Sequence, residues 1–277
     1  MKLTNYSDVR KVIKKRSLHS HKGENGTVLV IGGSEHYVSA PALSALAALR
    51  TGIDLIQVAG PEKAAYAINS FSIDFITKKM KGTFMDESHS EELLAFASDF
   101  DCVLIGPGLG KRDSTKKFVN KFIKENKIPI VIDADAIQQL NKENIKGLLC
   151  PHEREFEIVF GEKPSHDLNE RIHLTKKYAK EFNCTVLLKG HFDVVSDGVN
   201  VKVNKTGNPG MTVGGTGDIL SGIASGFVAQ KNSFFDSAAA AAFVNGKIGD
   251  KLYNEMGYGF VASDFIPLIP KTIYGKK

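Results

Sequence analysis

The sequence contains no tryptophan and only three cysteines among its 277 residues. Cys102, Cys150 and Cys184 are far apart, form no CxxC pair, and each borders or lies in an apolar stretch. This pattern excludes a zinc knuckle and a thioredoxin-type redox site. We therefore expect three small buried thiols in a reducing compartment, with the cytoplasm as the default location.

Long hydrophobic runs and an excess of one charge are also missing. The longest apolar runs, such as 238–244, are far shorter than the roughly 20 residues that a membrane-spanning helix needs, and the first 15 residues have no apolar signal core. The net charge is +5, from 36 basic and 31 acidic residues. The densest basic cluster consists of Lys11, Lys14, Lys15 and Arg16. It is interpreted as the solvated face of an N-terminal helix whose other face holds residues 9, 12 and 13. We expect no membrane and no nucleic acid among the partners.

Short apolar runs alternate with helical patterns along most of the chain. Runs that are apolar throughout indicate strands covered on both faces, and strand–helix alternation predicts a parallel sheet with right-handed crossovers. A hairpin is predicted around Asp197-Gly198. The predicted strands are 28–31, 54–58, 102–105, 130–132, 148–150, 186–188, 193–196 and 200–203, and the predicted helices are 41–50, 91–97, 115–126, 153–160, 169–182, 218–230 and 235–253. The fold class is α/β, and 1–277 is interpreted as one domain.

Several predicted strands are followed directly by glycine. Gly32-Gly33 follows the first, the run Gly106–Gly110 follows the third, and Gly190 follows Lys189 after the sixth. Ligands of open α/β sheets bind beyond the carboxyl ends of the strands, where glycine lets the backbone approach a ligand closely. The three turns together predict a ligand-binding edge.

The most informative segment is 204–222, where glycines cluster just before a helical pattern. The amides of Gly214 to Gly217 can form an anion site at the helix N-terminus, and a polyphosphate suits its electrostatics. Asp218 lies at or near that terminus. Its carboxylate is either a plain N-cap or a base that takes a proton from a hydroxyl attacking phosphorus. The glycine run favours the base, because a cap does not need it. The small residues 221, 222, 225 and 226 predict a close neighbour on the other helix face.

Three better-known motifs are excluded. Gly246-Lys247 is followed by Ile248, so there is no P-loop. The spacing of Gly106, Gly108 and Gly110 is not that of a dinucleotide-binding fingerprint. His152-Glu153 begins like the zincin motif HExxH, but the fifth residue is Phe156.

The stretch GNPGMTVGGTGDILSG at 207–222 resembles the glycine-rich signature of the ADP/ATP-dependent NAD(P)H-hydrate dehydratases, a branch of the ribokinase-like fold. The resemblance covers nearly the whole chain. Further matching stretches are His21-Lys22-Gly23, Gly32-Gly33-Ser34 with Tyr37 and Ala40-Pro41, 47–52, 106–110, 133–136, Pro151-His152 with Glu155-Phe156, Lys189-Gly190 and 262–264.

The resemblance implies a three-layer sandwich with a mostly parallel central sheet, helices on both faces and a small antiparallel hairpin. It implies repair of hydrated NADH and NADPH: ADP, or less readily ATP, phosphorylates the ring hydroxyl, and phosphate then leaves to restore NAD(P)H. Mg²⁺ is the expected cofactor, without identifiable ligands. A homo-oligomer, a tetramer by resemblance, is expected. The roughly 25 residues before the first strand are too few for the epimerase domain that many members carry at the N-terminus.

The resemblance also implies roles for individual residues. Asp218 would activate the hydroxyl, and the hydrated dinucleotide would contact Ala40, Gly108, His152 and Asp218. The adenine nucleotide would contact Lys189, Gly190, His191, Phe192, Asp193, Gly214, Gly215, Thr216 and Gly217.

Three positions depart from the family pattern. Ser39 stands where glycine often precedes Ala-Pro, and Glu153-Arg154 replaces Pro-Gly after His152. Asp193 replaces a common threonine, which places a carboxylate near the expected phosphates, an unfavourable arrangement without a metal between them.

Other residues keep two interpretations. His152 is a ligand contact or a helix cap, and Lys189 binds nucleotide or is a solvated strand end. Asp133 and Asp135 hold Mg²⁺ through water or start a turn. Tyr37 either closes over a ligand or only packs against the rest of the protein.

Two alternative functions remain. A small-molecule kinase of the same fold would share the phosphate site and the base but release a phosphorylated sugar or vitamin alcohol. A nucleotide sensor would bind without turnover, and Asp218 counts against it.

Overall fold

The computed structural model describes residues 2–275, whose strands form one ten-stranded sheet. Every neighbouring pair is parallel except that β9 runs antiparallel to both of its neighbours. In spatial order the strands are β1 (Lys2–Leu3), β10 (Val201–Asn204), β9 (Asp193–Ser196), β8 (Thr185–Leu188), β7 (Leu148–Leu149), β6 (Ile130–Ile132), β5 (Cys102–Ile105), β2 (Thr27–Ile31), β3 (Leu55–Pro61) and β4 (Ile76–Met80).

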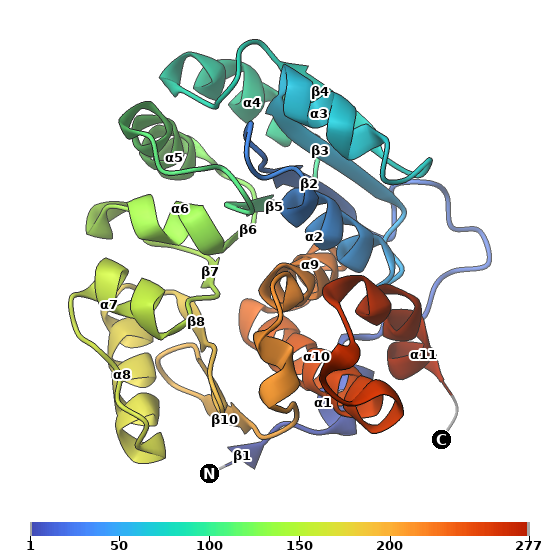
Figure 1. The fold of residues 1–277 in the computed structure, drawn as a ribbon, viewed down its shortest axis with the longest axis vertical. Coiled ribbons are helices and arrows are strands. Elements are labelled where there is room, and N and C mark those ends of the chain that lie inside the picture. Colours follow the sequence, from blue (N-terminus) through green and yellow to red (C-terminus); the bar gives the residue numbers. More distant parts are fainter. Residues whose placement is uncertain (1, 276–277) are drawn as a thin grey trace.

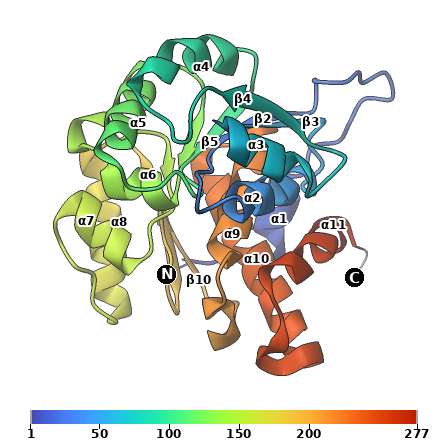
Figure 2. The same ribbon diagram turned by 45° about the horizontal axis from the view of Figure 1, so that its top comes forward.

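Helices cover both faces of this sheet (Figure 1). One layer contains α1 (Tyr6–Val12), α2 (Ser39–Leu49), α3 (Glu62–Asn69), α9 (Thr216–Ala229), α10 (Phe234–Met256) and α11 (Ile269–Tyr274). The other contains α4 (Ser90–Ala97), α5 (Asp113–Glu125), α6 (Ala134–Gln139), α7 (Glu153–Phe160) and α8 (Leu168–Glu181). Short 3₁₀ helices are η1 (Glu87–His89), η2 (Lys142–Asn144), η3 (Pro209–Thr212), η4 (Gly257–Gly259) and η5 (Ala262–Leu268). The turned view in Figure 2 shows the same separation of the two layers.

The apolar strands pack on both faces because side chains alternate along a strand. Val28 and Val30 belong to the hydrophobic core under α2, α9 and α10, whereas Leu29 and Ile31 belong to the core under α4 to α8. All four side chains are fully buried. The prediction of a sheet covered on both sides is confirmed.

Most predicted elements are present, several at the predicted bounds, such as β5, β6 and α7. The sequence patterns did not predict β1, β4, α3, α6 or α11. β4 is an edge strand with two lysines in five residues, so it lacks the apolar run that revealed the central strands. The hairpin is confirmed: Oδ1 of Asp197 accepts hydrogen bonds from the amides of Val199 (2.9 Å) and Asn200 (2.6 Å) in the turn between β9 and β10.

The small residues of α9 form its contact with α2. A Cβ at Gly222 would lie 2.3 Å from the carbonyl oxygen of Ser44, and a Cβ at Gly226 would lie 2.2 Å from Oγ1 of Thr51. The two helices therefore approach each other more closely than any larger side chains would allow. This crossing fixes where the first turn of α9 lies above the sheet.

The three cysteines are buried and free. Burial raises the pKa of the Cys184 thiol to about 12 and that of Cys102 higher still. They behave as the small core residues that the sequence predicts. Within residues 2–275, no helix combines the length and apolar character required to span a bilayer.

The α2–α9 crossing gives a stability prediction. Gly222→Ala should lower the free energy of unfolding by about 1–3 kcal/mol, because the added methyl group overlaps a backbone carbonyl that cannot rotate away. Gly259→Ala is the matched control, since no heavy atom lies within 4 Å of its Cβ position. Urea unfolding of both variants measures the difference. Equal midpoints would show that the crossing tolerates a larger residue.

Candidate active site

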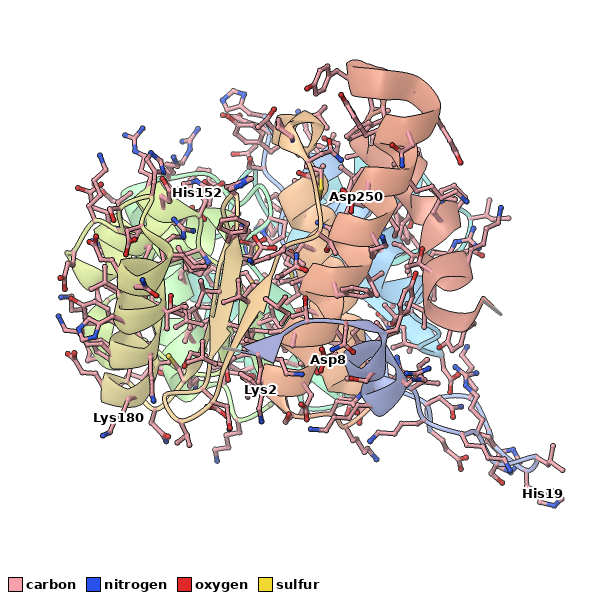
Figure 3. The ribbon with its side chains drawn as sticks, turned by 90° about the horizontal axis from the view of Figure 1, so that it is seen from below. Lys2, Asp8, His19, His152, Lys180 and Asp250 are labelled. Carbon is pink, nitrogen blue, oxygen red and sulfur yellow. The ribbon has the colours of Figure 1, made fainter. Side chains whose placement is uncertain are left out.

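The strand ends that carry glycine lie along one edge of the sheet. β2, β5 and β8 belong to its parallel part, so their carboxyl ends point the same way. Figure 3 shows His152, which follows β7, at the opposite end of the molecule from Lys2 and Lys180. The glycine-bearing strand ends therefore lie along one common edge of the sheet, as predicted.

A cavity of about 800 Å³ opens at this edge. Of the predicted site residues, it brings together His152, Lys189, Gly190, His191, Asp193, Thr216 and Gly217. The remaining wall is formed by 206–209, Met211 and Thr212, with Glu153, Arg154, Leu220 and Asn245. Its volume is that of a small-molecule site. Phe192, Gly214, Gly215 and Asp218 do not line this cavity. Phe192, Gly215 and Asp218 are each next in sequence to a residue that does.

The first turn of α9 presents a row of free amides. Gly215 is the N-cap, with a left-handed φ of +99°, and no side chain caps the helix. A Cβ at Gly215 would also lie 2.8 Å from atoms of Ala262 and Leu43, so glycine is required there. Within residues 2–275, the five successive N–H groups from Gly214 to Asp218 donate no hydrogen bond to protein. Free amides at a helix N-terminus are a ready anion site.

Asp218 is the third residue of α9 and is not its cap, which removes the plain N-cap interpretation. Its half-buried carboxylate accepts no hydrogen bond from the described residues. Burial raises the pKa of Asp218 to about 7, and the nearby carboxylates of Asp133, Asp135 and Glu155 add to the rise, while Lys189 opposes it. A carboxylate with a pKa near neutrality suits a general base.

Lys189 lies at the end of β8, and its ammonium is paired between two buried acids. Its Nζ is 2.7 Å from Oδ1 of Asp133 and 3.8 Å from Oε2 of Glu155, and 3.5 Å from the Cβ position of Gly217 on α9. Burial alone would lower the Lys189 pKa, but the two carboxylates outweigh it and raise the pKa. The solvated-lysine interpretation is therefore wrong, because this cation stays charged beside the free amides.

Asp193 is held by the protein. Its Oδ1 accepts from the amide of Gly190 (3.1 Å) and its Oδ2 from Nδ2 of Asn204 (3.0 Å). Burial raises the Asp193 pKa, and these two donors oppose the rise. Both oxygens thus shape the loop after β8, which accounts for a carboxylate at this position.

His152 caps α7. Its Nδ1 accepts hydrogen bonds from the amides of Arg154 (3.1 Å) and Glu155 (3.2 Å). In turn, Oε2 of Glu155 accepts from the amide of His152 (2.9 Å). The cap interpretation therefore holds for this ring nitrogen. The half-exposed imidazole also lines the cavity, so its role as a ligand contact stays a prediction.

Glu153, which departs from the family pattern, forms an ion pair within the structure. Buried Arg171 of α8 donates from Nη1 to Oε1 of Glu153 (2.6 Å) and from Nη2 to the carbonyl oxygen of Lys189 (3.0 Å). One guanidinium therefore ties the start of α7 to the end of β8. A proline-glycine pair would not provide this carboxylate.

Ala40 and Gly108 lie apart from the large cavity. A Cβ at Gly108 would be 2.8 Å from Cβ of Tyr37 and 3.5 Å from that of Ala40. Tyr37, which is 57% exposed, lines a second cavity of about 330 Å³ together with Asp135. Of the predicted substrate residues, His152 lines the large cavity, whereas Ala40 and Gly108 adjoin Tyr37 of the second one. Asp218 lines neither, but its pKa is influenced by Lys189 of the large cavity and Asp135 of the second.

Sequence reasoning missed two residues of the site. Arg171 lies on a predicted helix in register with Leu174 and Tyr178, so a buried arginine was detectable from its spacing. Asn245 is a lone amide in an alanine-rich helix. Its Nδ2 donates to the carbonyl oxygen of Thr216 (3.4 Å), and its buried Oδ1 has no partner among the described residues.

The residues do not form a metal cage of their own. Within residues 2–275, no cluster of three or more His, Cys, Asp or Glu side chains is arranged to hold a metal. Asp133 is paired with Lys189, and Oδ2 of Asp135 accepts from the amide of Gly110 at 2.9 Å. A Mg²⁺ ion here would need phosphate oxygens and water as its main ligands.

A mostly parallel α/β sheet with free amides, a lysine and a carboxylate at one helix N-terminus defines a nucleotide-dependent phosphoryl-transfer class of enzyme. Residues 28–271 match the family described as NAD(P)H-hydrate dehydratase. The chain belongs to this family.

Named relatives agree with this assignment. The chain is 39% identical over 272 residues to the ADP-dependent (S)-NAD(P)H-hydrate dehydratase of Cenarchaeum symbiosum, covering 96% of this chain and 94% of that protein. It is 42% identical over 262 residues to the bifunctional NAD(P)H-hydrate repair enzyme of Pyrobaculum aerophilum, covering 93% of this chain. The match covers 52% of that enzyme, so the chain spans about half the length of such bifunctional relatives.

The fold is shared with a solved structure. The ADP/ATP-dependent NAD(P)H-hydrate dehydratase of Bacillus subtilis, co-crystallised with ATP and Mg²⁺, superimposes with a TM-score of 0.82 at 23% identity, covering 98% of each chain. The predicted ribokinase-like fold class is confirmed.

The raised Asp218 pKa predicts a pH-dependent effect on stability. Between the ordinary Asp pKa and about 7, the unfolded chain ionises Asp218 while the folded chain keeps the proton, so this group lowers stability as pH rises. Asp218→Asn should therefore stabilise the protein by roughly 1–2 kcal/mol at pH 8, after allowance for solvent screening, and by less at pH 5. Thermal unfolding at the two pH values measures this. The exposed Asp99→Asn is the control, and equal shifts for both variants would contradict the prediction.

Lys189 gives a second prediction. Lys189→Met should cost roughly 3–5 kcal/mol of unfolding free energy, because it leaves Asp133 and Glu155 buried without a cation. Lys189→Met combined with Asp133→Asn should recover part of the loss, as one uncompensated charge disappears. Urea unfolding checks both, with exposed Lys117→Met as control. Strict additivity of the two changes would show that Lys189 and Asp133 are not coupled.

Proposed function

We propose that the protein uses an adenine nucleotide, ADP first and ATP second, to dehydrate hydrated NADH or NADPH, releasing NAD(P)H, phosphate and, from ADP, AMP. The observation that carries this proposal is the Asp218 carboxylate beside five free amides and the Lys189 ammonium. The names of the full-length archaeal relatives support the same reaction.

The nucleotide would occupy the 800 Å³ cavity. Its phosphates would meet the amides of Gly214 to Gly217, and the Lys189 ammonium would offset their charge. Gly190, His191 and Asp193 would line the path of the rest of the nucleotide, with Thr216 at the base of the cavity. Because the protein binds both oxygens of Asp193, this carboxylate is not aimed freely at phosphate. Phe192 would affect the nucleotide only through His191, because the centres of the two rings lie 4.3 Å apart.

The chemistry needs a base and a charge-stabilising cradle. Asp218 accepts the proton of the ring hydroxyl as that oxygen attacks the terminal phosphorus, and the bond from phosphorus to the bridging oxygen breaks to release AMP. The free amides stabilise the charge on the phosphoryl oxygens. In the second step the C–O bond of the phosphate ester breaks, and phosphate leaves with the electron pair. The neighbouring carbon loses a proton to water, and the ring double bond returns. Ala40, Gly108 and His152 would contact the hydrated dinucleotide.

Mg²⁺ would arrive bound to the nucleotide and neutralise phosphate charge. The ATP/Mg²⁺ co-crystal of the Bacillus subtilis protein supports such an ion. Since the acids of this site are paired with protein groups, we assign the ion no protein ligand and no step.

We also propose a cytoplasmic location and a homotetramer. Three buried free thiols suit a reducing compartment. Sedimentation of the purified protein would test the tetramer.

One assay tests the reaction. The protein is incubated with hydrated NADH and either ADP or ATP, and the return of nicotinamide absorbance is followed. Asp218→Asn should lower turnover by roughly 10²–10⁴ while nucleotide affinity changes only a few-fold, as expected for removal of a positioned base. The wild-type rate should fall below pH 7 as Asp218 takes up a proton.

Asp99→Asn is the control. No recovery with either nucleotide would defeat the proposal, and a stable phosphorylated product from a sugar or vitamin alcohol would identify a kinase instead. Equal loss of binding and turnover in Asp218→Asn would mark Asp218 as structural.

A further inference from the structure

The second cavity lies where the order of the strands changes direction. From β2 the chain builds outward through β3 to β4, and β5 then returns to the other side of β2. Such a switch point leaves a crevice at the carboxyl ends of the two strands, where open α/β sheets bind ligands. The cavity of about 330 Å³ lies there: Ser34 follows β2, Gly110 follows β5 and Asp135 follows β6.

The wall of this cavity contains an unused polar group. Ser34 is 6% exposed, and its buried Oγ has no hydrogen-bond partner among residues 2–275. Two backbone hydrogen bonds close its loop, because the amides of Ser34 and Tyr37 donate to each other's carbonyl oxygens at 3.2 and 3.3 Å. A buried hydroxyl without a partner costs stability unless a ligand or water satisfies it.

Asp135 supplies the complementary acceptor. Its Oδ2 accepts from the amide of Gly110 (2.9 Å), whose carbonyl oxygen accepts from Nε2 of Gln139 (2.8 Å), so the wall is held in place. The other oxygen, Oδ1, accepts no hydrogen bond from the described residues. A serine hydroxyl and a carboxylate oxygen together match the hydroxyl groups of a ribose.

The rim of the cavity adds aromatic surface and two cations. The Arg112 guanidinium lies 4.6 Å from the centre of the Phe84 ring and 2.8 Å from Oε1 of Glu35. Neighbouring Lys111 is exposed, and its ammonium has no ion-pair partner among residues 2–275. An arginine fixed by stacking, with a free lysine beside it, suits a phosphate group.

Cavity size limits what binds. A volume of 330 Å³ is at the small end of the roughly 300–1,000 Å³ typical of small-molecule sites, so it admits about half of a dinucleotide. The cavity adjoins the Tyr37–Gly108–Ala40 contact, and Asp135 is near enough to influence Asp218. A ligand here would therefore lie at the same edge of the sheet as the Asp218 carboxylate.

We propose that this second cavity binds the nicotinamide riboside half of the hydrated dinucleotide, with Ser34 and Asp135 on the ribose hydroxyls and Lys111 and Arg112 on the adjoining phosphate. The proposal rests on the proposed function and adds the residues that determine substrate affinity. In this assignment the large cavity holds the phosphoryl donor and the small one holds the acceptor.

Steady-state kinetics test the assignment. Lys111→Ala and Arg112→Ala should each raise KM for hydrated NADH about tenfold, as expected for loss of a charge-assisted hydrogen bond, with kcat and KM for ADP within about twofold. Ser34→Ala should raise the same KM without lowering the melting temperature, because its hydroxyl bonds to no protein group. Lys117→Ala, an exposed lysine on the neighbouring α5, is the matched control.

A binding measurement separates this proposal from the reaction itself. Nicotinamide mononucleotide should bind the wild-type protein in calorimetry, more weakly after Arg112→Ala or Ser34→Ala, and should compete with hydrated NADH but not with ADP. If turnover is normal and these variants leave KM unchanged, or if the mononucleotide competes with ADP, the cavity assignment is wrong while the proposed function stands. If turnover is absent but the mononucleotide binds as described, the proposed function fails and the ligand site remains.

Discussion

The Lys189 ammonium is the charge on which the site depends. Four carboxylates, those of Asp133, Asp135, Glu155 and Asp218, gather at one edge of the sheet, and Lys189 is the cation that opposes them in setting the Asp218 pKa. It pairs closely with two of them. Burial, together with the remaining excess of negative charge, raises the pKa of Asp218 to about 7. The same lysine faces Gly217, so one ammonium links the acid cluster to the anion site.

Backbone geometry determines where these charges meet. The close crossing of α2 and α9 places the first turn of α9 over the strand ends, and Gly215 begins the helix without a side-chain cap. Arg171 holds the end of β8 from below through the Lys189 carbonyl oxygen. The elements of the candidate site therefore come from distant parts of the sequence but rest on a shared packed core, as the positioning of a base beside an anion site requires.

Much of this arrangement could be predicted from the sequence, for identifiable reasons. The central strands carry uninterrupted apolar runs, which predict buried strands. The glycines in 214–217 predict unpaired amides around the start of the helix that begins at Thr216. The Lys189–Asp133 pair was not predictable, because it joins residues 56 positions apart and depends on strand order. The edge strand β4 was missed for lack of an apolar run. The separation of His152 from Ala40 and Gly108, which lie outside the large cavity, also depends on tertiary placement, which residue spacing along the chain does not encode.

The start of the chain pairs with the far side of the sheet. β1 runs parallel to β10, so Lys2 lies at the amino ends of the strands, and Figure 3 shows it remote from His152. An affinity tag or carrier protein attached ahead of Lys2 would emerge on the face that bears neither cavity. Immobilisation through that end would leave both cavity mouths open to solution, which makes this terminus the better anchoring point for surface-based binding experiments.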